Sequence, residues 1–239
     1  MNALTSLEGI IYYPKNWNPQ DKSRCLIYHN PNGTTVGEYF VWNDDLSWTP
    51  KKFQELAKCP IILYDYRGTG LSSENHNFQP TCESIIADGE KALQYALNQF
   101  QSVDVVGSSL GAGVATASLD RHLKKAPEDC QRVRLFNHDS FSTTPRVLMP
   151  NWPTIADWGG WAVGALLDAK TPMKNLIQKE IPITVLCHLD DPVIPKGARM
   201  AEYVAGLPPA QNVSILYSPD HGHANLSSDM IQSLTEKLI

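Results

Sequence analysis

The sequence lacks any Cys-x-x-Cys pair, although it contains five cysteines. These are Cys25, Cys59, Cys82, Cys130 and Cys187. Their odd number and wide spacing argue against a zinc knuckle and a dithiol redox centre. Free thiols of this kind favour a reducing compartment.

Long apolar runs are also missing. No stretch approaches the roughly 20 residues that span a bilayer, and residues 1–9 have neither the basic start nor the apolar core of a signal peptide. We therefore expect a protein without a transmembrane segment that is located in the cytoplasm. Secretion without a cleaved signal would leave no trace in the sequence.

The sequence has fewer basic than acidic residues. It contains 20 Lys and Arg and 25 Asp and Glu, which give a net charge of −5. This balance argues against a broad basic face for nucleic acid. Hydrophobic residues make up 42% and charged residues 19%, which excludes disorder as the main state. With 239 residues and no internal repeat, we expect one domain over residues 1–239.

Short apolar runs alternate with longer helical patterns along the chain. The runs predict strands at 25–29, 61–66, 103–107, 132–137, 183–188 and 213–218. The longer patterns predict helices at 81–100, 110–124, 196–207 and 225–239. Runs that are apolar on both faces favour an α/β fold with a mostly parallel central sheet and helices on both faces. Residues 6–13 would add an antiparallel edge strand.

One segment, residues 139–179, breaks this alternation. It is rich in proline and contains Trp152, Trp158 and Trp161. It is too short for a domain of its own, so we expect either a small lid over the carboxyl edge of the sheet or a loop and helix that fill space. As a lid, its aromatic residues would favour a short to medium apolar acyl group.

A Gly-x-Ser-x-Gly pattern lies between the strand predicted at 103–107 and the helix predicted at 110–124. Gly107, Ser109 and Gly111 form it. A nucleophile on a sharp strand-to-helix turn needs tiny residues two positions before and after it. We therefore predict that Ser109 is a nucleophile and that the Leu110 amide binds an oxyanion. The alternative is a glycine-rich turn whose serine caps a helix, and Ser108 fits the spacing poorly.

A serine nucleophile needs a base, and the base needs an acid that orients it. His221 and His223 follow the last predicted strand, and Asp190 and Asp191 follow the strand before it. We expect one residue of each pair to serve. The histidine pair has no further ligand at a convincing spacing, so we expect no metal. Of the other histidines, we expect His76 and His122 to be solvated, and His138 and His188 to pack near the site.

Four segments together resemble the α/β-hydrolase superfamily over nearly the whole chain. They are His29-Asn30-Pro31-Asn32-Gly33, Asp65 to Ser72, Gly107 to Gly111, and Asp191-Pro192-Val193-Ile194-Pro195 with Gly222-His223. The resemblance implies that Asp191 is the acid and His223 the base. It also implies that Arg67, Gly68 and Gly70 shape the loop beside the site.

The sequence departs from the family pattern at Pro31, where many relatives donate an oxyanion amide. Proline has no amide hydrogen, so a second donor must come from the backbone of Asn30 or Asn32 or from an asparagine side chain. The resemblance is to small-capped esterases and thioesterases. It implies a serine hydrolase that acts on an ester or thioester of a small-molecule or acyl-bearing substrate, without a cofactor. An acyltransferase and a catalytically weak binding protein on the same fold are the alternatives.

Overall fold

The computed structural model describes residues 7–41, 49–72, 80–144, 147 and 167–238. Seven strands form one sheet in the order β1-β3-β2-β4-β5-β6-β7. They are β1 (Gly9–Tyr12), β2 (Arg24–His29), β3 (Ile61–Tyr64), β4 (Ser102–Ser108), β5 (Val133–His138), β6 (Ile183–Asp190) and β7 (Val213–His221). Among the strands of the described residues, only β1 is antiparallel to its neighbour, with Gly9 opposite Tyr64. The prediction of a mostly parallel α/β sheet is confirmed, as is its antiparallel edge.

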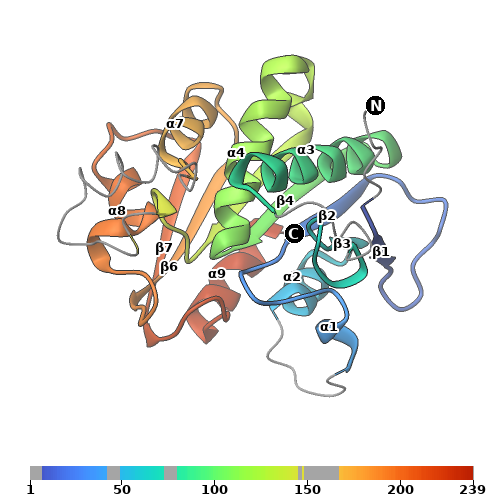
Figure 1. The fold of residues 1–239 in the computed structure, drawn as a ribbon, viewed down its shortest axis with the longest axis horizontal. Helices are drawn as coiled ribbons and strands as arrows, with labels where there is room; N and C mark the ends of the chain where they lie inside the picture. The colour runs from blue at the N-terminus through green and yellow to red at the C-terminus, as the bar shows by residue number, and fades with distance from the viewer. Residues whose placement is uncertain (1–6, 42–48, 73–79, 145–146, 148–166, 239) are drawn as a thin grey trace.

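Helices cover both faces of the sheet (Figure 1). They are α1 (Glu38–Val41), α2 (Thr49–Ala57), α3 (Cys82–Gln99), α4 (Leu110–Lys125), α7 (Lys170–Gln178), α8 (Met200–Ala205) and α9 (Ser228–Leu238), with short 3₁₀ turns at Gly70–Ser72, Pro127–Arg132 and Lys196–Ala198. No helix in the described part of the chain is both long and apolar enough to cross a membrane.

Two apolar cores lie on opposite faces of the sheet because alternate strand residues point to opposite sides. On β2, Cys25 and Ile27 belong to the core that also contains residues of α3, α4, α7 and α8. Leu26 and Tyr28 belong to the core beneath α2 and α9. Strands that are apolar on both faces are therefore buried on both, which is the basis on which the sequence predicts them.

The helix predicted at 196–207 is interrupted. Lys196–Ala198 is a 3₁₀ turn, Arg199 is extended (φ −66°, ψ 141°), and α8 begins at Met200. The buried guanidinium of Arg199 donates hydrogen bonds to the carbonyl oxygens of Leu189 and Ile194. These contacts hold the extended residue, which periodicity alone does not indicate.

The last helix begins later than predicted, at Ser228 rather than near residue 225. Ala224 has a positive φ of 58°, which a helix cannot include. The hydroxyl of Ser227 accepts the Met230 N–H at 3.3 Å and caps the first turn.

The segment predicted as a lid is described only in part. Residues 145–146 and 148–166, which include its three tryptophans, lie outside the described residues. Its last part forms α7, where Met173 and Leu176 are fully buried in the core shared with α4. The lid over the sheet stays a prediction.

The chain reverses its direction of travel across the sheet between β2 and β4. From β2 it passes outward to β3, and from β4 it passes the other way to β5. Loops that leave neighbouring strands in opposite directions open a crevice at the carboxyl edge of the sheet. The residues that follow β2 and β4 therefore meet at a place where a ligand can bind.

Candidate active site

Ser109 lies on the sharp turn between β4 and α4. Its φ of 53° and ψ of −119° fall in a region that costs a non-glycine residue about 1–3 kcal/mol. A Cβ at Gly107 would lie 2.4 Å from the Gly111 carbonyl oxygen, and one at Gly111 would lie 2.0 Å from the His29 carbonyl oxygen. Both positions therefore need glycine. The Ser109 N–H donates to the carbonyl of His138 at 2.9 Å and ties the turn to β5.

His223 connects the loop after β7 to this turn. Its Nε2 lies 2.9 Å from the Ser109 Oγ, and its Nδ1 lies 2.9 Å from Oδ2 of Asp191. Its own N–H donates to the side-chain oxygen of Asn225 at 3.0 Å. A Cβ at Gly222 would lie 2.6 Å from that same oxygen. The small residue before His223 therefore allows the loop to close on Asn225.

Asp191 is buried and held from both sides. Its Oδ1 accepts the N–H groups of Val193 and Ile194 at 2.7 and 2.9 Å, which leaves Oδ2 for His223. Arg199 donates to the Asp191 carbonyl oxygen at 3.3 Å. These hydrogen bonds fix the orientation of the Asp191 carboxylate. An ionised Asp191 selects the His223 tautomer that carries its proton on Nδ1 and turns the Nε2 lone pair toward Ser109.

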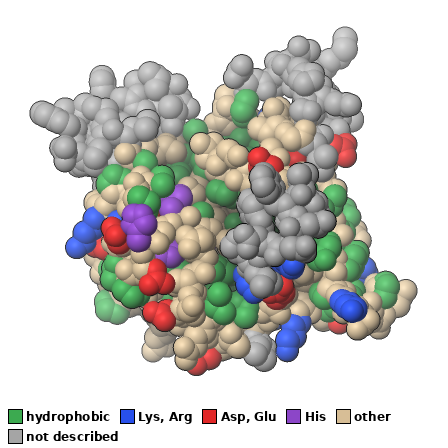
Figure 2. All heavy atoms as spheres, turned by 90° about the horizontal axis from the view of Figure 1, so that it is seen from below, with side chains coloured by type: hydrophobic (Ala, Val, Ile, Leu, Met, Phe, Trp, Pro, Cys, Tyr) green, Lys and Arg blue, Asp and Glu red, His purple; other side chains and the backbone are tan. Residues whose placement is uncertain are grey.

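The neighbouring residues His221 and Asp190 bond to each other instead. Their Nδ1 and Oδ2 atoms lie 2.9 Å apart, and their side chains are 67% and 73% exposed. Figure 2 shows histidine side chains beside acidic ones on this face of the molecule. The structure thus brings together Ser109, Asp191 and His223 and leaves this second pair at the surface.

Ser108, the other serine of the elbow, points into the protein. It is fully buried, and its hydroxyl accepts a hydrogen bond from the Tyr28 OH at 2.9 Å and lies 3.1 Å from Nδ1 of His138. A hydroxyl held in this way does not face the crevice where a substrate would bind.

The residues predicted to bind an oxyanion differ in their surroundings. Leu110 is the first residue of α4, so its N–H has no partner within the helix. Asn30 is buried, and its side-chain amide donates to the Tyr64 carbonyl at 2.9 Å, whereas Asn32 is exposed. Pro31 has no N–H to offer. The Asn30 side-chain amide is thus turned toward β3, which leaves backbone groups and the Asn32 side chain as the second donors to consider.

Two of the loop residues singled out after β3 have close partners. Arg67 donates from Nε and Nη2 to the fully buried carboxylate of Asp88 at 3.0 and 2.5 Å. Gly70 has a φ of 44°, and a Cβ there would overlap the Asp65 carboxylate. Both contacts fix the shape of the loop beside the crevice.

The sequence predicts that His76 and His122 are both solvated. His76 lies outside the described residues, and the prediction for His122 is wrong. His122 is 7% exposed, and its Nε2 lies 2.8 Å from Oδ2 of Asp129. The polar sequence around His122 suggests exposure. Its partner Asp129 lies on the 3₁₀ turn that follows α4, which the local sequence does not indicate. His138 and His188, expected to pack near the site, are both fully buried there.

Sequence reasoning missed Asp139, the residue that follows β5. It is 2% exposed and lies so close to the candidate site that one oxygen of its carboxylate, one of Asp191 and one ring nitrogen of His223 fall within 4.8 Å of one another. The rule that selected the other residues, a polar side chain just after a strand, would also have selected it.

Two overlapping groups of described residues have metal-ligating atoms within 4.8 Å of one another, and Asp139 belongs to both. In the group with His138 and His188, Nδ1 of His188 lies 2.7 Å from Oδ2 of Asp139. Two ligands each about 2.0–2.2 Å from a tetrahedral zinc ion would lie roughly 3.4 Å apart. The contact fits a hydrogen bond better than a shared metal ion.

No protein-family model matches the sequence, and no curated protein matches it significantly. Solved structures do match, and they have the α/β-hydrolase fold. Acetyl xylan esterase 1 from Thermoanaerobacterium sp. has a TM-score of 0.61 and 17% identity over 97% of this chain and 79% of its own. Ferulic acid-bound Est1E from Butyrivibrio proteoclasticus has a TM-score of 0.59 and 14% identity over 97% and 92%. The Bacillus cereus carboxylesterase has a TM-score of 0.54 and 10% identity over 99% and 94%.

These likenesses show the α/β-hydrolase fold, and the resemblance expected from the sequence is confirmed at that level. Two of the three proteins are esterases by their names. At these identities the reaction and the residues that carry it out in this chain are matters for proposal.

Proposed function

We propose that this protein is a serine hydrolase that cleaves an ester or thioester through an acyl-enzyme on Ser109. The observation that carries the proposal is the pair of hydrogen bonds made by His223, one to Ser109 and one to Asp191, each 2.9 Å long. A nucleophile, a base within reach of it and an acid that orients the base are the parts that acyl transfer needs. The names of two structural neighbours, an acetyl xylan esterase and a carboxylesterase, support the reaction class.

In this mechanism the Ser109 Oγ attacks the substrate carbonyl carbon while its proton passes to Nε2 of His223. The imidazolium that forms is stabilised by Asp191 through Nδ1. His223 then returns the proton to the leaving alcohol or thiol as the carbon–oxygen or carbon–sulfur bond breaks. Water, deprotonated by His223, attacks the acyl-enzyme and releases the acid and free Ser109.

The oxyanion would be bound at the N-terminus of α4. The Leu110 N–H is the first donor, and the positive end of a 16-residue helix adds to its field. Backbone N–H groups of Asn30 or Asn32 are the proposed second donors, because Pro31 cannot donate. An oxyanion site with one donor fewer loses about 10²–10³ in rate, so this position sets how active the enzyme is.

A pocket of about 200 Å³ lies between the loop after β2 and the loop that carries His223. Pro31, Tyr39, Pro50 and Ala224 are among its lining residues. We assign this pocket to a short group of the substrate, on either the acyl or the alcohol side.

The experiment that tests the proposal is fluorophosphonate labelling together with hydrolysis of p-nitrophenyl esters from acetyl to octanoyl. The wild type is expected to label and turn over, whereas Ser109→Ala is expected to fold, fail to label and lose turnover. If the pocket holds the acyl group, Tyr39→Ala is expected to extend the preferred acyl chain because it enlarges the pocket; an unchanged chain-length preference assigns the pocket to the alcohol side. Labelling that persists in Ser109→Ala, or a wild type that neither labels nor hydrolyses any ester, would overturn the proposal.

Product analysis in the same assay separates the hydrolase from an acyltransferase. Free acid as the main product in the presence of an added alcohol supports hydrolysis. An ester of the added alcohol as the main product assigns the acyl-enzyme to transfer instead.

A further inference from the structure

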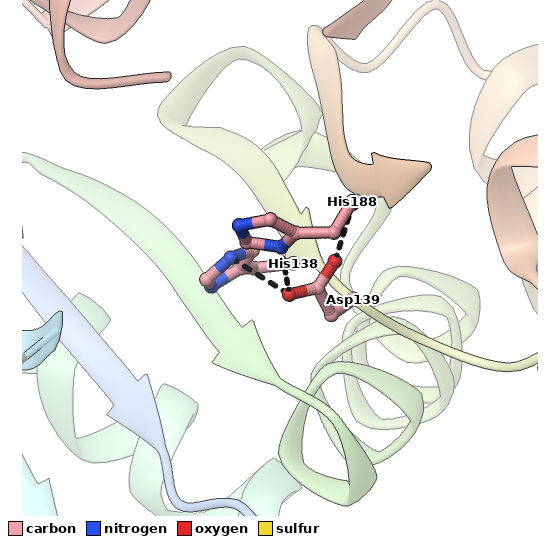
Figure 3. A group of neighbouring side chains, drawn as sticks. All are labelled: His138, Asp139 and His188. Carbon is pink, nitrogen blue, oxygen red and sulfur yellow. Dashed lines mark hydrogen bonds and ion pairs between the residues drawn. The ribbon is translucent and has the colours of Figure 1, made fainter. Parts of the chain in front are cut away.

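Several N–H groups surround the carboxylate of Asp139 next to the candidate active site. We call Asp139, His138 and His188 the Asp139 hub. Oδ1 of Asp139 accepts the backbone N–H of His188 at 2.9 Å, and its Oδ2 lies 2.7 Å from the His188 Nδ1. The same Oδ2 lies 3.2 Å from Nε2 of His138. Figure 3 shows both histidine rings beside the Asp139 carboxylate, with dashed lines from each to it. All three side chains are fully buried.

A further donor to this carboxylate comes from the loop that carries the candidate base. The N–H of Ala224, the residue after His223, donates to Oδ2 of Asp139 at 2.8 Å. This hydrogen bond joins two residues with positive φ, 44° at Asp139 and 58° at Ala224. Such conformations cost about 1–3 kcal/mol each and persist only where the surroundings hold them.

Through His138, the Asp139 hub also contacts the turn that carries Ser109. Nδ1 of His138 lies 3.1 Å from the Ser108 hydroxyl, and the His138 carbonyl accepts the Ser109 N–H at 2.9 Å. Asp139 therefore contacts, directly or through His138, both the turn that carries Ser109 and the loop that carries His223. These two segments lie more than 100 residues apart in the sequence.

We propose that Asp139 is a positioning residue that sets the His223 ring in line with the Ser109 hydroxyl, by holding the Ala224 amide on one side and His138 on the other. The inference rests on the proposed function. Burial alone would raise the pKa of Asp139, but the charges and hydrogen bonds of His138 and His188 hold it well below its usual range. The carboxylate thus stays charged, and a charged acceptor makes hydrogen bonds about twice as strong as neutral ones.

The test compares Asp139→Ala, Asp139→Asn and a matched control, Asp104→Asn. Asp104 is equally buried and accepts hydrogen bonds from Arg24 and Arg134, but it lies near the amino end of β4. The control therefore reports what loss of a buried carboxylate does to stability alone. For each variant we would measure thermal stability, kcat, KM and the exchange rate of the Ala224 amide hydrogen.

Asp139→Ala is expected to lower kcat about 10–100-fold, as losses of such supporting residues do in other sites, with KM within threefold of the wild type. Asparagine keeps an oxygen for the Ala224 N–H, so Asp139→Asn should recover kcat to within about fivefold. Asp104→Asn should lose thermal stability while kcat stays within twofold. The Ala224 amide should exchange at least tenfold faster in Asp139→Ala only.

A folded Asp139→Ala with kcat within twofold of the wild type and a protected Ala224 amide would overturn the inference. Equal losses of kcat in Asp104→Asn would overturn it too, because the effect would then be general destabilisation. If Asp139→Ala does not fold, Asp139→Ser is measured in its place, since its short hydroxyl cannot span both sets of donors. A wild type without fluorophosphonate labelling refutes the proposed function, whereas Ala224 exchange still decides the role of Asp139.

Discussion

Two histidine–aspartate pairs, His221–Asp190 and His223–Asp191, lie at the carboxyl ends of β6 and β7. The two histidines are two residues apart in the sequence, and the two aspartates are adjacent. Each pair has Nδ1 of histidine 2.9 Å from Oδ2 of aspartate. In the pair His221–Asp190 both side chains are mostly exposed. In the pair His223–Asp191 they are 16% and 1% exposed, and Nε2 of the histidine meets Ser109.

The comparison teaches that hydrogen-bond length does not separate a surface pair from a candidate catalytic one. The difference lies in burial and in what the second ring nitrogen contacts. A charge pair at 4 Å gains about 1 kcal/mol in water and about 4 kcal/mol at the effective dielectric constant near a protein surface. Only the inner pair can therefore stabilise the imidazolium strongly at the moment when it forms.

The largest contrast is expected between His223→Ala and His221→Ala. Removing the base of a serine triad costs several orders of magnitude in kcat, so His223→Ala should lose about 10⁴-fold or more. His221→Ala should stay within about threefold, because the hydrogen bond that its ring makes is to an exposed aspartate. Ester hydrolysis and fluorophosphonate labelling rates measure both. Near-normal turnover in His223→Ala with a dead His221→Ala would reverse the roles of the two pairs.

The two acids should show the same order, with a gap no larger than that between the two histidines. Asp191→Asn keeps the volume of the side chain but removes the charge that selects the His223 tautomer, which in a comparable triad costs about 10⁴-fold in kcat. Asp190→Asn should change kcat less than threefold. The ratio of the two kcat values, measured at one pH on the same ester, checks this. A ratio near one would place the acid elsewhere, and Asp139, which has a carboxylate oxygen within 4.8 Å of a His223 ring nitrogen, would be the next candidate.

The sequence predicts the fold well because the strands are apolar on both faces and the elbow glycines have no substitute. It leaves the choice between Asp190 and Asp191, or between His221 and His223, to the family resemblance, because residues so close in sequence follow the same strands. Only the position of the β6 and β7 ends shows which of each pair turns inward.

Other features depend on contacts that local patterns do not encode. The break at Arg199 follows from carbonyl oxygens up to ten residues away. The burial of His122 follows from an aspartate beyond the end of α4. The Asp139 hub forms only when β5, β6 and the loop after β7 pack together, and these segments are far apart in the sequence.

The buried pair His188–Asp139 and the exposed pair His221–Asp190 should differ in how they make the free energy of unfolding depend on pH. Burial lowers the pKa of His188, but the hydrogen bond and charge of Asp139 outweigh it, so the pKa is raised above its ordinary 6.5. The folded protein then binds more protons than the unfolded chain above pH 6.5. This contribution to the free energy of unfolding is full below pH 6.5 and is lost as the pH rises through the folded pKa.

One such proton gives a slope of at most about 1.4 kcal/mol per pH unit. His188→Gln should remove this part of the alkaline loss, measured by denaturant unfolding between pH 6 and 9, whereas His221→Gln should keep it. An unchanged slope in His188→Gln would show that the buried pair does not carry the proton.

The smallest effect is expected for the stability of the outer pair itself. An exposed ion pair contributes about 0.2–1 kcal/mol and is screened by salt. Asp190→Asn should therefore lower the free energy of unfolding by less than about 0.5 kcal/mol at low salt, and by still less at 1 M NaCl, where the interaction is screened. Asp191→Asn should cost more than 1 kcal/mol at either salt concentration, because its Oδ1 accepts two N–H groups that would then have only a neutral acceptor. Urea unfolding at low and high salt measures both, and equal losses would show that burial does not distinguish the two pairs.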